Sequence, residues 1–567
     1  TGKILMDSTR LFAGVILAVS SFLLVQEWLT ENREKNAVDQ VSQEPEIKSI
    51  LEDTNAVDLP QPNVAVPERS DLNLDSTPSD DMAPYTSAFG GERIVVKTDT
   101  LEVVFDTLGP EIVKVELLNH PSKESKNSNF VILNKTPNHF YTAQIGLIGE
   151  NLPNHKDIFY TKNRSYTLSE TEDTLIVDFS TEKKDIILNH VFKFTRGSYL
   201  IEVLSETKNL RQEPVRAHAY YQLVRDNTNP SGNSMMLPTY TGVALFTEES
   251  KYKKIDFEDI KKGEKKYPQI ASDGWIAIIQ HYFLGGWIPE ENETREYYTR
   301  YQKNDLYSVG VILPLQTVDS GQTVSVENRL YVGPQDQDRL SEISKGLNLT
   351  VDYGWLTIIA SPLFDLLQWI HKFVGNWGWS IVVLTIIIKL IFYPLSAASY
   401  KSMAKMRVVA PKLQKLKELY GNDKQRMQQE MMALYKKEQI NPLGGCLPIL
   451  VQIPVFIALY WVLLASVELR YAPFLLWIDD LSAKDPYYIL PVLMGLSMIV
   501  QTRLNPTPPD PVQAKIMKIM PVVFSAFFFF FPAGLVLYWL ANNILSIAQQ
   551  WRITKVIEGK TKSNGRT

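Results

Sequence analysis

The sequence lacks the short motifs on which most enzymes depend. It contains no H-E-x-x-H zinc motif, no phosphate-binding loop of the Walker A kind and no G-x-S-x-G nucleophile turn. Its seven histidines are scattered, with no pair at the spacing of metal ligands. We therefore expect a protein that is not an enzyme and that uses no cofactor or metal.

Cysteine is nearly absent, and the charge balance is slightly acidic. The single cysteine, Cys446, excludes an intramolecular disulfide, so packing alone must hold any folded domain together. A net charge of −5 argues against general nucleic-acid binding, which usually requires a basic domain. The 567 residues are enough for two or more domains of about 100–200 residues each.

The N-terminal part predicts an anchor and a tether. Residues 11–29 are apolar over about the length that spans a bilayer, and no small-residue cleavage site follows them, so residues 6–30 are expected to form an uncleaved signal anchor. Residues 1–5 precede Met6 and are expected to be an added leader. Residues 31–90 are rich in Asp, Glu, Ser, Pro and Asn, which is typical of a disordered tether.

Residues 91–346 show the alternation of β-strands. Val113, Val115 and Leu117 alternate with Lys114 and Glu116. Further strands are expected around residues 175–179, 199–204, 307–313 and 323–327. Many short strands separated by turn residues predict an all-β sandwich.

After residue 350 the apolar residues recur at helical spacing. Residues 351–375 predict an amphipathic helix in the membrane interface. Within residues 376–552, spans are expected at about 377–397, 442–467, 486–503, 517–531 and 533–551, with a cytoplasmic helical hairpin at 399–441 and a basic tail at 553–567. Together with the N-terminal anchor these make six spans.

The last apolar run, residues 519–547, is divided by Pro532 and Gly534. As one straight helix it would be about 43 Å long, which exceeds a hydrocarbon core of about 30 Å. Basic residues flank the run on both sides: Lys515, Lys518, Arg552, Lys555 and Lys560. Because basic residues favour the cytoplasm, a hairpin of two spans is expected, with both chain ends inside and residues 91–346 outside.

Lys389 lies within an apolar segment, where a cation costs roughly 2.5–3.5 kcal/mol on insertion scales. It either faces a water-filled cavity or extends to the cytoplasmic edge of the membrane. Polar residues on nearby spans favour the cavity: Thr385, Gln452, Tyr538, Asn542, Ser546 and Gln549. Ordinary hydrogen bonding between helices is the alternative explanation for these residues.

Two further segments leave alternatives open. Residues 527–531 are five phenylalanines, preceded by Met517 and Met520. They form either an adaptable apolar surface for many partners or a face that contacts lipid. The charged hairpin either contacts ribosomal RNA or lipid headgroups, or is simply solvated.

Several stretches resemble a known family: VDYGW (351–355), SMAKMR (402–407), NPLGGCLP (441–448), DPYYILP (485–491) and FPAGLVLYW (531–539). Over nearly its whole length the chain resembles the Gram-negative form of the YidC/Oxa/Alb family of membrane protein insertases. The resemblance implies a polytopic α-helical protein of the bacterial inner membrane with a large periplasmic super-sandwich. Its five C-terminal spans would enclose a hydrophilic groove, open to the cytoplasm and lipid, in which nascent membrane proteins insert and fold.

The resemblance also implies site residues and partners. Lys389, Thr385, Tyr538 and Trp539 match positions tied to function in the family, and Gln452 and Asn542 join them in the expected groove. Cys446, Ile449 and Phe456 match contact positions of a client slide, to which Met520 and Phe528 are added. Relatives usually carry arginine where Lys389 stands, so this groove keeps the charge but loses the planar fork. The implied partners are nascent membrane proteins, the Sec translocon and its accessory subunits, membrane lipids and, through the hairpin and basic tail, the ribosome.

Two other functional classes compete with this interpretation. A secondary transporter also has polar groups within its spans, but it predicts inverted repeats, and five core spans divide poorly into two halves. A receptor or scaffold would bind through its sandwich. Deletion of the sandwich distinguishes this class, because an insertase should survive that deletion and a receptor should not.

Overall fold

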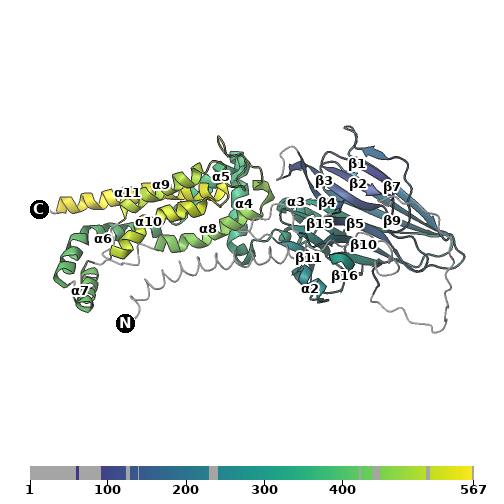
Figure 1. Cartoon of the computed structure of the whole chain (residues 1–567), viewed down its shortest axis with the longest axis horizontal. Helices are drawn as coiled ribbons and strands as arrows, with labels where there is room; N and C mark the ends of the chain where they lie inside the picture. The colour runs from purple at the N-terminus through teal and green to yellow at the C-terminus, as the bar shows by residue number, and fades with distance from the viewer. Residues whose placement is uncertain are drawn as a thin grey trace, which may run out of the picture. The chain divides into compact units, whose positions relative to one another are not determined.

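The computed structural model describes residues 59–62, 91–122, 128–137, 139–228, 240–420, 423–438, 447–505 and 511–564 (Figure 1). The predicted signal anchor lies outside the described residues. The chain divides into two compact units. The first, here the β unit, holds Thr1–Val243, Ile255–Ile278 and Pro289–Leu330. The second, here the helical unit, holds Ala244–Lys254, Ile279–Ile288 and Tyr331–Thr567.

The described strands form two sheets. The first has the order β13 (Ile270–Ala271), β16 (Arg295–Tyr301), β17 (Leu306–Pro314), β10 (His218–Asp226), β5 (His139–Ile148), β4 (Asn129–Thr136), β3 (Glu111–Pro121), β2 (Leu101–Asp106), β1 (Arg93–Lys97) and β6 (Ser165–Thr167). The second has the order β12 (Lys251–Ile255), β11 (Thr241–Thr247), β14 (Trp275–Gln280), β15 (Phe283–Pro289), β18 (Thr323–Pro334), β9 (Leu200–Asn209), β8 (Ile186–Thr195) and β7 (Thr174–Lys183). A short helix, α2 (Phe257–Lys261), follows β12.

Aromatic side chains pack between the two sheets of the β unit. Phe105 of β2 lies 5.1 Å from Phe179 of β7 and 4.7 Å from Phe192 of β8, measured between ring centroids. Buried and partly exposed residues alternate along β8, because successive side chains in a strand point to opposite faces. The sequence-based prediction of a β-sandwich is therefore confirmed, and the same alternation places Val115 and Leu117 of β3 in the core.

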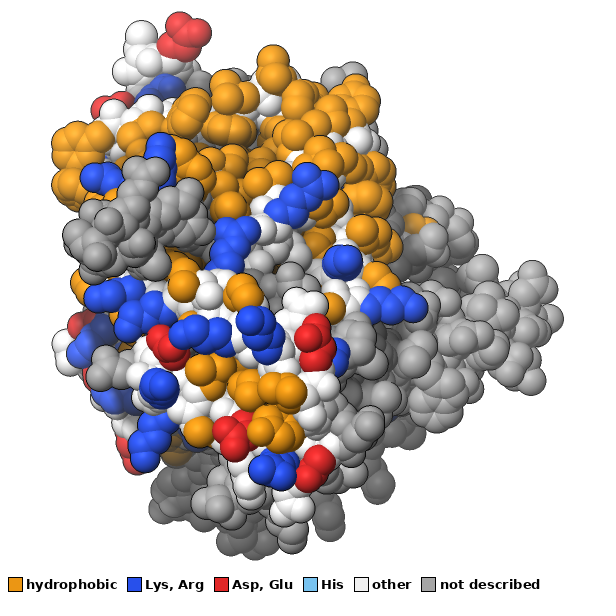
Figure 2. Space-filling view, turned by 90° about the vertical axis from the view of Figure 1, so that its left-hand side faces the viewer, with side chains coloured by type: hydrophobic (Ala, Val, Ile, Leu, Met, Phe, Trp, Pro, Cys, Tyr) orange, Lys and Arg blue, Asp and Glu red, His pale blue; other side chains and the backbone are white. Residues whose placement is uncertain are grey.

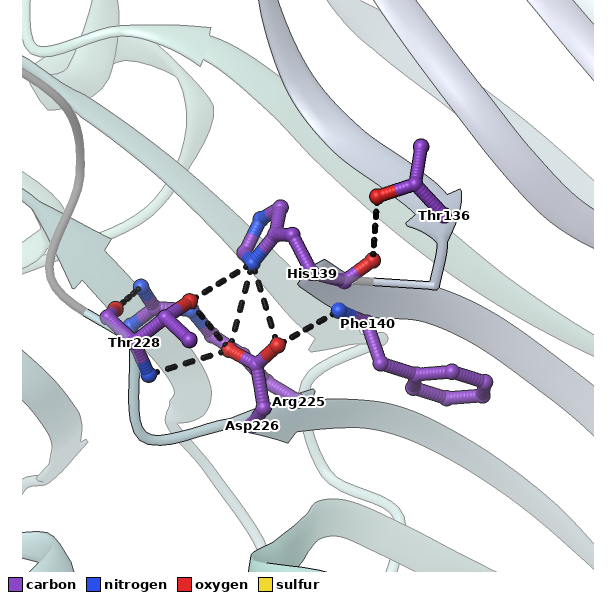
Figure 3. A network of polar contacts seen from close by, with 6 residues as sticks. All are labelled: Thr136, His139, Phe140, Arg225, Asp226 and Thr228. Atoms are coloured by element: carbon purple, nitrogen blue, oxygen red, sulfur yellow. Dashed lines mark hydrogen bonds and ion pairs between the residues drawn. The ribbon is translucent and has the colours of Figure 1, made fainter. Parts of the chain in front are cut away.

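A polar network ties the start of β5 to the end of β10 (Figure 3). Asp226 accepts hydrogen bonds from the Phe140 amide (2.6 Å) and from the Thr228 amide (3.1 Å), and it lies 3.1 Å from Nδ1 of His139. Burial alone would raise the pKa of Asp226, but hydrogen bonds from His139, Thr228 and the Phe140 amide hold this pKa below its ordinary value. Arg225 donates to the backbone carbonyl of Thr228 at 2.7 Å and so closes the turn.

The helical unit contains α3 (Gln337–Ile343), η3 (Leu347–Thr350), η4 (Gly354–Leu356), α4 (Thr357–Val374), α5 (Trp377–Ile391), α6 (Tyr393–Tyr420), α7 (Lys424–Lys437), α8 (Leu447–Ala465), η6 (Val467–Leu469), α9 (Ile489–Leu504), α10 (Pro511–Phe528) and α11 (Ala533–Asn564). Within the described ranges, no helix taken singly has both the length and the apolar character to cross a bilayer. The joined helices α5 and α6 meet that test as a pair bent by 69°.

Several predicted helix bounds differ from the structure: α10 begins at Pro511 rather than at residue 517, and α11 continues to Asn564 through most of the predicted basic tail. The amphipathic helix begins at Thr357 rather than at residue 351, because Gly354 adopts a left-handed φ of 63° and its amide bonds to the Asp352 side chain at 2.7 Å. The first core helix does not run straight to residue 397, since it ends at Ile391 and the chain bends there. Pro394 explains this bend, because a proline disfavours helical backbone at the residue before it and is best tolerated in a first helical turn.

The polar segment after this bend forms a helical hairpin. Helices α6 and α7 pack through Val409, Leu413 and Tyr435, which are buried between them. Asp423 caps α7 by accepting from the Arg426 amide at 3.0 Å. Lys and Arg side chains are spread over the end of the molecule that carries this hairpin, and apolar side chains gather beside them (Figure 2).

One part of the predicted tether is ordered. Residues 59–62 are described, and the carbonyl of Leu59 accepts a hydrogen bond from Arg300 of β16 at 2.8 Å. Leu59 also packs against the side chains around Tyr220 and Ile312. Arg300 lies 241 residues from Leu59 in the sequence. The composition of residues 31–90, on which the prediction of a disordered tether rests, therefore could not reveal this contact.

Candidate functional site

The site is a group of polar side chains on α5, α8 and α11, which we call the polar cluster. It consists of Thr385, Lys389, Gln452, Tyr538, Asn542 and Ser546. Helix α11 packs against both α5 and α8, so residues from three separate segments meet. The break between α10 and α11 makes this possible, because it starts a new helix at Ala533 and directs Tyr538 inward.

Lys389 occupies the last turn of α5 and points toward α11. Its Nζ donates a hydrogen bond to Oγ of Ser546 at 2.7 Å, and Ser546 in turn donates to the Asn542 carbonyl at 2.7 Å. The neighbouring residues Leu390 and Ile391 are both 65% exposed. The ammonium group is therefore turned into the bundle, while the apolar side chains beside it face outward.

A second contact links α8 to α11. Gln452 donates a hydrogen bond to the hydroxyl of Tyr538, whose side chain is fully buried. Thr385 is also buried, but its hydroxyl donates to the carbonyl of Ile381 at 2.7 Å, one turn back in its own helix. Thr385 therefore contributes a satisfied hydroxyl near Lys389 rather than a free donor.

Helix α11 also carries buried polar atoms that have no hydrogen-bond partner among the described residues. They are Nε1 of Trp539, Oδ1 of Asn542, Nε2 of Gln549 and Oε1 of Gln550. A buried polar atom without a partner costs about 1–3 kcal/mol. Helix α11 therefore carries more buried polar groups than the described helices around it satisfy with hydrogen bonds.

Aromatic rings join α8, α10 and α11 next to the polar cluster. Phe456 lies 4.7 Å from Trp539 and 5.9 Å from Phe528, and Phe528 lies 5.4 Å from Trp539. We call these three residues the aromatic cluster. Of the predicted slide residues, Phe528 is buried inside the bundle, whereas Met520 is partly exposed. Cys446 and the side chain of Ile449 lie outside the described part of the chain.

The phenylalanine run is divided between two environments. Phe528 is buried among other aromatic rings, while Phe530 is 50% exposed. Neither of the two alternatives considered for residues 527–531 therefore describes the whole run.

Sequence reasoning missed a second polar seam, which lies between α9 and α11. Asn543 donates to Ser497 at 3.1 Å, and Gln550 donates to Asn505 at 3.0 Å. Asn543 and Gln550 are seven residues apart, which is two helical turns, so their spacing could have revealed a shared face.

Comparisons with known proteins agree with this architecture. Residues 93–366 match the family described as the YidC periplasmic domain, and residues 369–561 match the family described as the 60Kd inner membrane protein. A membrane protein insertase YidC of Methylobacillus flagellatus is 50% identical over 99% of this chain and 100% of its own length. The corresponding protein of Aromatoleum aromaticum is 49% identical over 98% of this chain and 99% of its own length.

A solved structure of an active YidC insertase, with its first transmembrane domain resolved, covers 81% of this chain and 92% of its own at 18% identity and a TM-score of 0.39. The two relatives are similar to this chain from end to end, and the two family matches divide it into a periplasmic domain and an inner-membrane part. The chain therefore belongs to the YidC family, whose members are membrane protein insertases and not enzymes.

Proposed function

We propose that the polar cluster lines a hydrated groove that receives the polar segment of a membrane protein during insertion. The observation that carries this proposal is the hydrogen bond from Lys389 to Ser546, which keeps a cation inside the bundle. The polar atoms on α11 that lack partners support it as well. Water or polar groups of the inserting chain would satisfy these atoms and remove their cost.

The mechanism needs no nucleotide. Water and the charge of Lys389 lower the cost of bringing a polar, often acidic, segment of the client partway across the membrane. The apolar helix of the client then moves along α8 and α10 into lipid. Its transfer out of water drives insertion by about 25 cal/mol per Å² of apolar surface.

Packing of the helices supports an exit between α8 and α10. Helix α10 packs mainly on α9, and α8 packs mainly on α4. The two helices that would form the slide meet at the ring contact between Phe456 and Phe528. Separation of these two rings would open a path from the polar cluster to lipid, with Cys446, Ile449 and Met520 as further slide residues.

The charge distribution supports six spans with both chain ends in the cytoplasm. The α6–α7 hairpin is rich in Lys and Arg, whereas the loop at residues 466–488 contains more acidic than basic residues. We place the hairpin in the cytoplasm, and the loop and the β unit in the periplasm. Helix α4 would lie in the interface, since Trp369 and Phe373 are exposed on it.

Several partners follow from this topology. Nascent membrane proteins would enter the groove, alone or from the Sec translocon and its accessory subunits. The hairpin and the basic tail would contact the ribosome, and the apolar surface of α9 and α10 would contact membrane lipids. A transporter of small solutes is the competing class, and it would not crosslink to a nascent chain.

Photocrosslinking to a stalled nascent membrane protein tests the proposal. A photoreactive phenylalanine analogue in place of Phe456 should crosslink to the client, because this ring lies between the polar cluster and the proposed exit. Leu496 of α9 is the matched control, since it is 54% exposed on another helix. Equal crosslinking from both positions would show that clients reach the surface only through lipid, and this would contradict the groove.

A further inference from the structure

The loop at residues 466–488 supplies hydrogen-bond partners to the N-termini of several helices at once. The first amides of any helix lack partners inside that helix and must find them elsewhere. In this unit α5, α9 and α11 all begin beside the same loop, although they are far apart in the sequence. The contacts that the loop makes with each of these three helices determine its role in the unit.

Asp485 connects the loop to α9. Its Oδ1 accepts from Nε1 of Trp477 and from the amide of Tyr487, both at 3.0 Å, and its Oδ2 accepts from the amide of Leu490 at 2.7 Å. Leu490 lies in the first turn of α9, and the N-cap residue Tyr488 provides no side-chain cap. Asp485 therefore replaces the missing cap, and its negative charge suits the positive end of the helix.

The backbone on either side of Ser482 connects the loop to α11. The amide of Ala533 donates to the carbonyl of Ala483 at 2.7 Å, and the amide of Gly534 donates to the carbonyl of Leu481 at 2.9 Å. Both donors belong to the first turn of α11. The turn that separates α10 from α11 is thus held by the loop two to four residues before Asp485.

The loop also packs against the start of α5. Nδ2 of Asn376, the residue that caps α5, donates to the Pro473 carbonyl at 3.0 Å. The ring of Phe474 fills the space above Gly378, where a Cβ atom would overlap it. Leu481 is fully buried in the core of the unit. The loop therefore reaches all three helices and buries part of its own apolar surface in the bundle.

We infer that Asp485 is a positioning residue that holds this loop as a seal over the end of the bundle opposite the α6–α7 hairpin. The inference rests on the function and topology proposed above, in which this end faces the periplasm. Asp485 is only 2% exposed, and all three of its hydrogen bonds constrain the loop or the start of α9. Its removal frees the loop from α9 and loosens the turn that starts α11.

Side-specific thiol labelling tests the seal in the full-length chain. A cysteine replaces Val536, which is buried on α11 one turn below the sealed end, in a background in which Cys446 is serine. A membrane-impermeant maleimide is added to spheroplasts, where it reaches the periplasmic face. With Asp485 present the reporter should label slowly. With Asp485→Ala it should label about tenfold faster, which corresponds to about 1.4 kcal/mol in the opening equilibrium.

Two variants make the expected result specific. Asp485→Asn keeps an oxygen for Trp477 and Tyr487 but turns an amide group toward the Leu490 amide, so its labelling rate should be intermediate. Tyr487→Ala removes an exposed side chain of the same loop but keeps the backbone amide that donates to Asp485, and it should label as slowly as the parent. Slow labelling of a stable Asp485→Ala protein would overturn the inference.

Two further measurements separate other outcomes. If Asp485→Ala merely unfolds the bundle, the reporter will label equally fast from the cytoplasmic face in inverted vesicles, and this result also overturns a specific seal. A cysteine at Leu476, which is 87% exposed in the loop, reports the topology independently. Labelling of that cysteine only from the cytoplasmic face would refute the proposed topology, whatever happens at residue 536.

Discussion

The charge of Lys389 should matter most for clients whose external segments are acidic. Replacement by alanine removes both the ammonium group and its hydrogen bond to Ser546. With an effective dielectric constant of about 20, a cation and a carboxylate about 7 Å apart attract each other by about 2.4 kcal/mol. Loss of that attraction should slow insertion of a client with one such carboxylate by up to about fiftyfold.

The assay compares pairs of clients that differ only in acidic residues of the external segment. Lys389→Ala should reduce insertion of the acidic client far more than that of its neutral partner. Lys389→Arg should preserve both because a cation remains, and Lys389→Glu should be the most harmful because the field is reversed. Lys372→Ala is the matched control, since this lysine is exposed in the last turn of α4, outside both the polar cluster and the α6–α7 hairpin.

The hydrogen bond from Lys389 to Ser546 provides a second test of the same reasoning. Ser546→Ala leaves the charge in place but removes the acceptor that keeps it inside the bundle. It should therefore weaken insertion of the acidic client less than Lys389→Ala does. Equal losses for both clients of a pair, in all Lys389 variants, would refute the electrostatic role and leave hydration as the remaining contribution of this residue.

Three other predictions concern the β unit, the hairpin and the periplasmic loop. A chain lacking residues 91–319 should still support growth in depletion–complementation, because the polar cluster lies elsewhere; failure despite stable expression would refute this modular view. Deletion of residues 402–439 should reduce insertion without changing the melting temperature of the rest, and normal insertion would contradict a role in client capture. Burial, with the charges of Asp336 and Asp338, raises the pKa of Glu468 to about 8 against the opposing effect of backbone amides. The folded state therefore holds this proton more tightly than the unfolded state, and stability should fall by up to about 1.4 kcal/mol per pH unit between about pH 5 and 8. Thermal unfolding of Glu468→Gln should show a weaker dependence over that range.

The sequence by itself determined those features that depend on neighbours along the chain. Alternation of Val115 and Leu117 with polar residues predicts β3, because a strand shows one face to the core at every second residue. Pro532 and Gly534 predict the break between α10 and α11, since proline cannot continue a helix without losing a hydrogen bond. The family also follows from the sequence, because a membrane protein insertase YidC is 50% identical to it over 99% of its length.

Only the tertiary structure decided how the polar residues are used. Lys389 and Ser546 are 157 residues apart, and Gln452 and Tyr538 are 86 apart, so no local spacing could pair them. Periodicity gives the face of a helix but not the partner across it. From the sequence alone, Asp485 is an ordinary turn residue. It is buried beneath two amide donors and one indole donor because its loop packs against the start of α9. Contacts of this kind arise from packing between distant segments, and a sequence read in one dimension does not contain them.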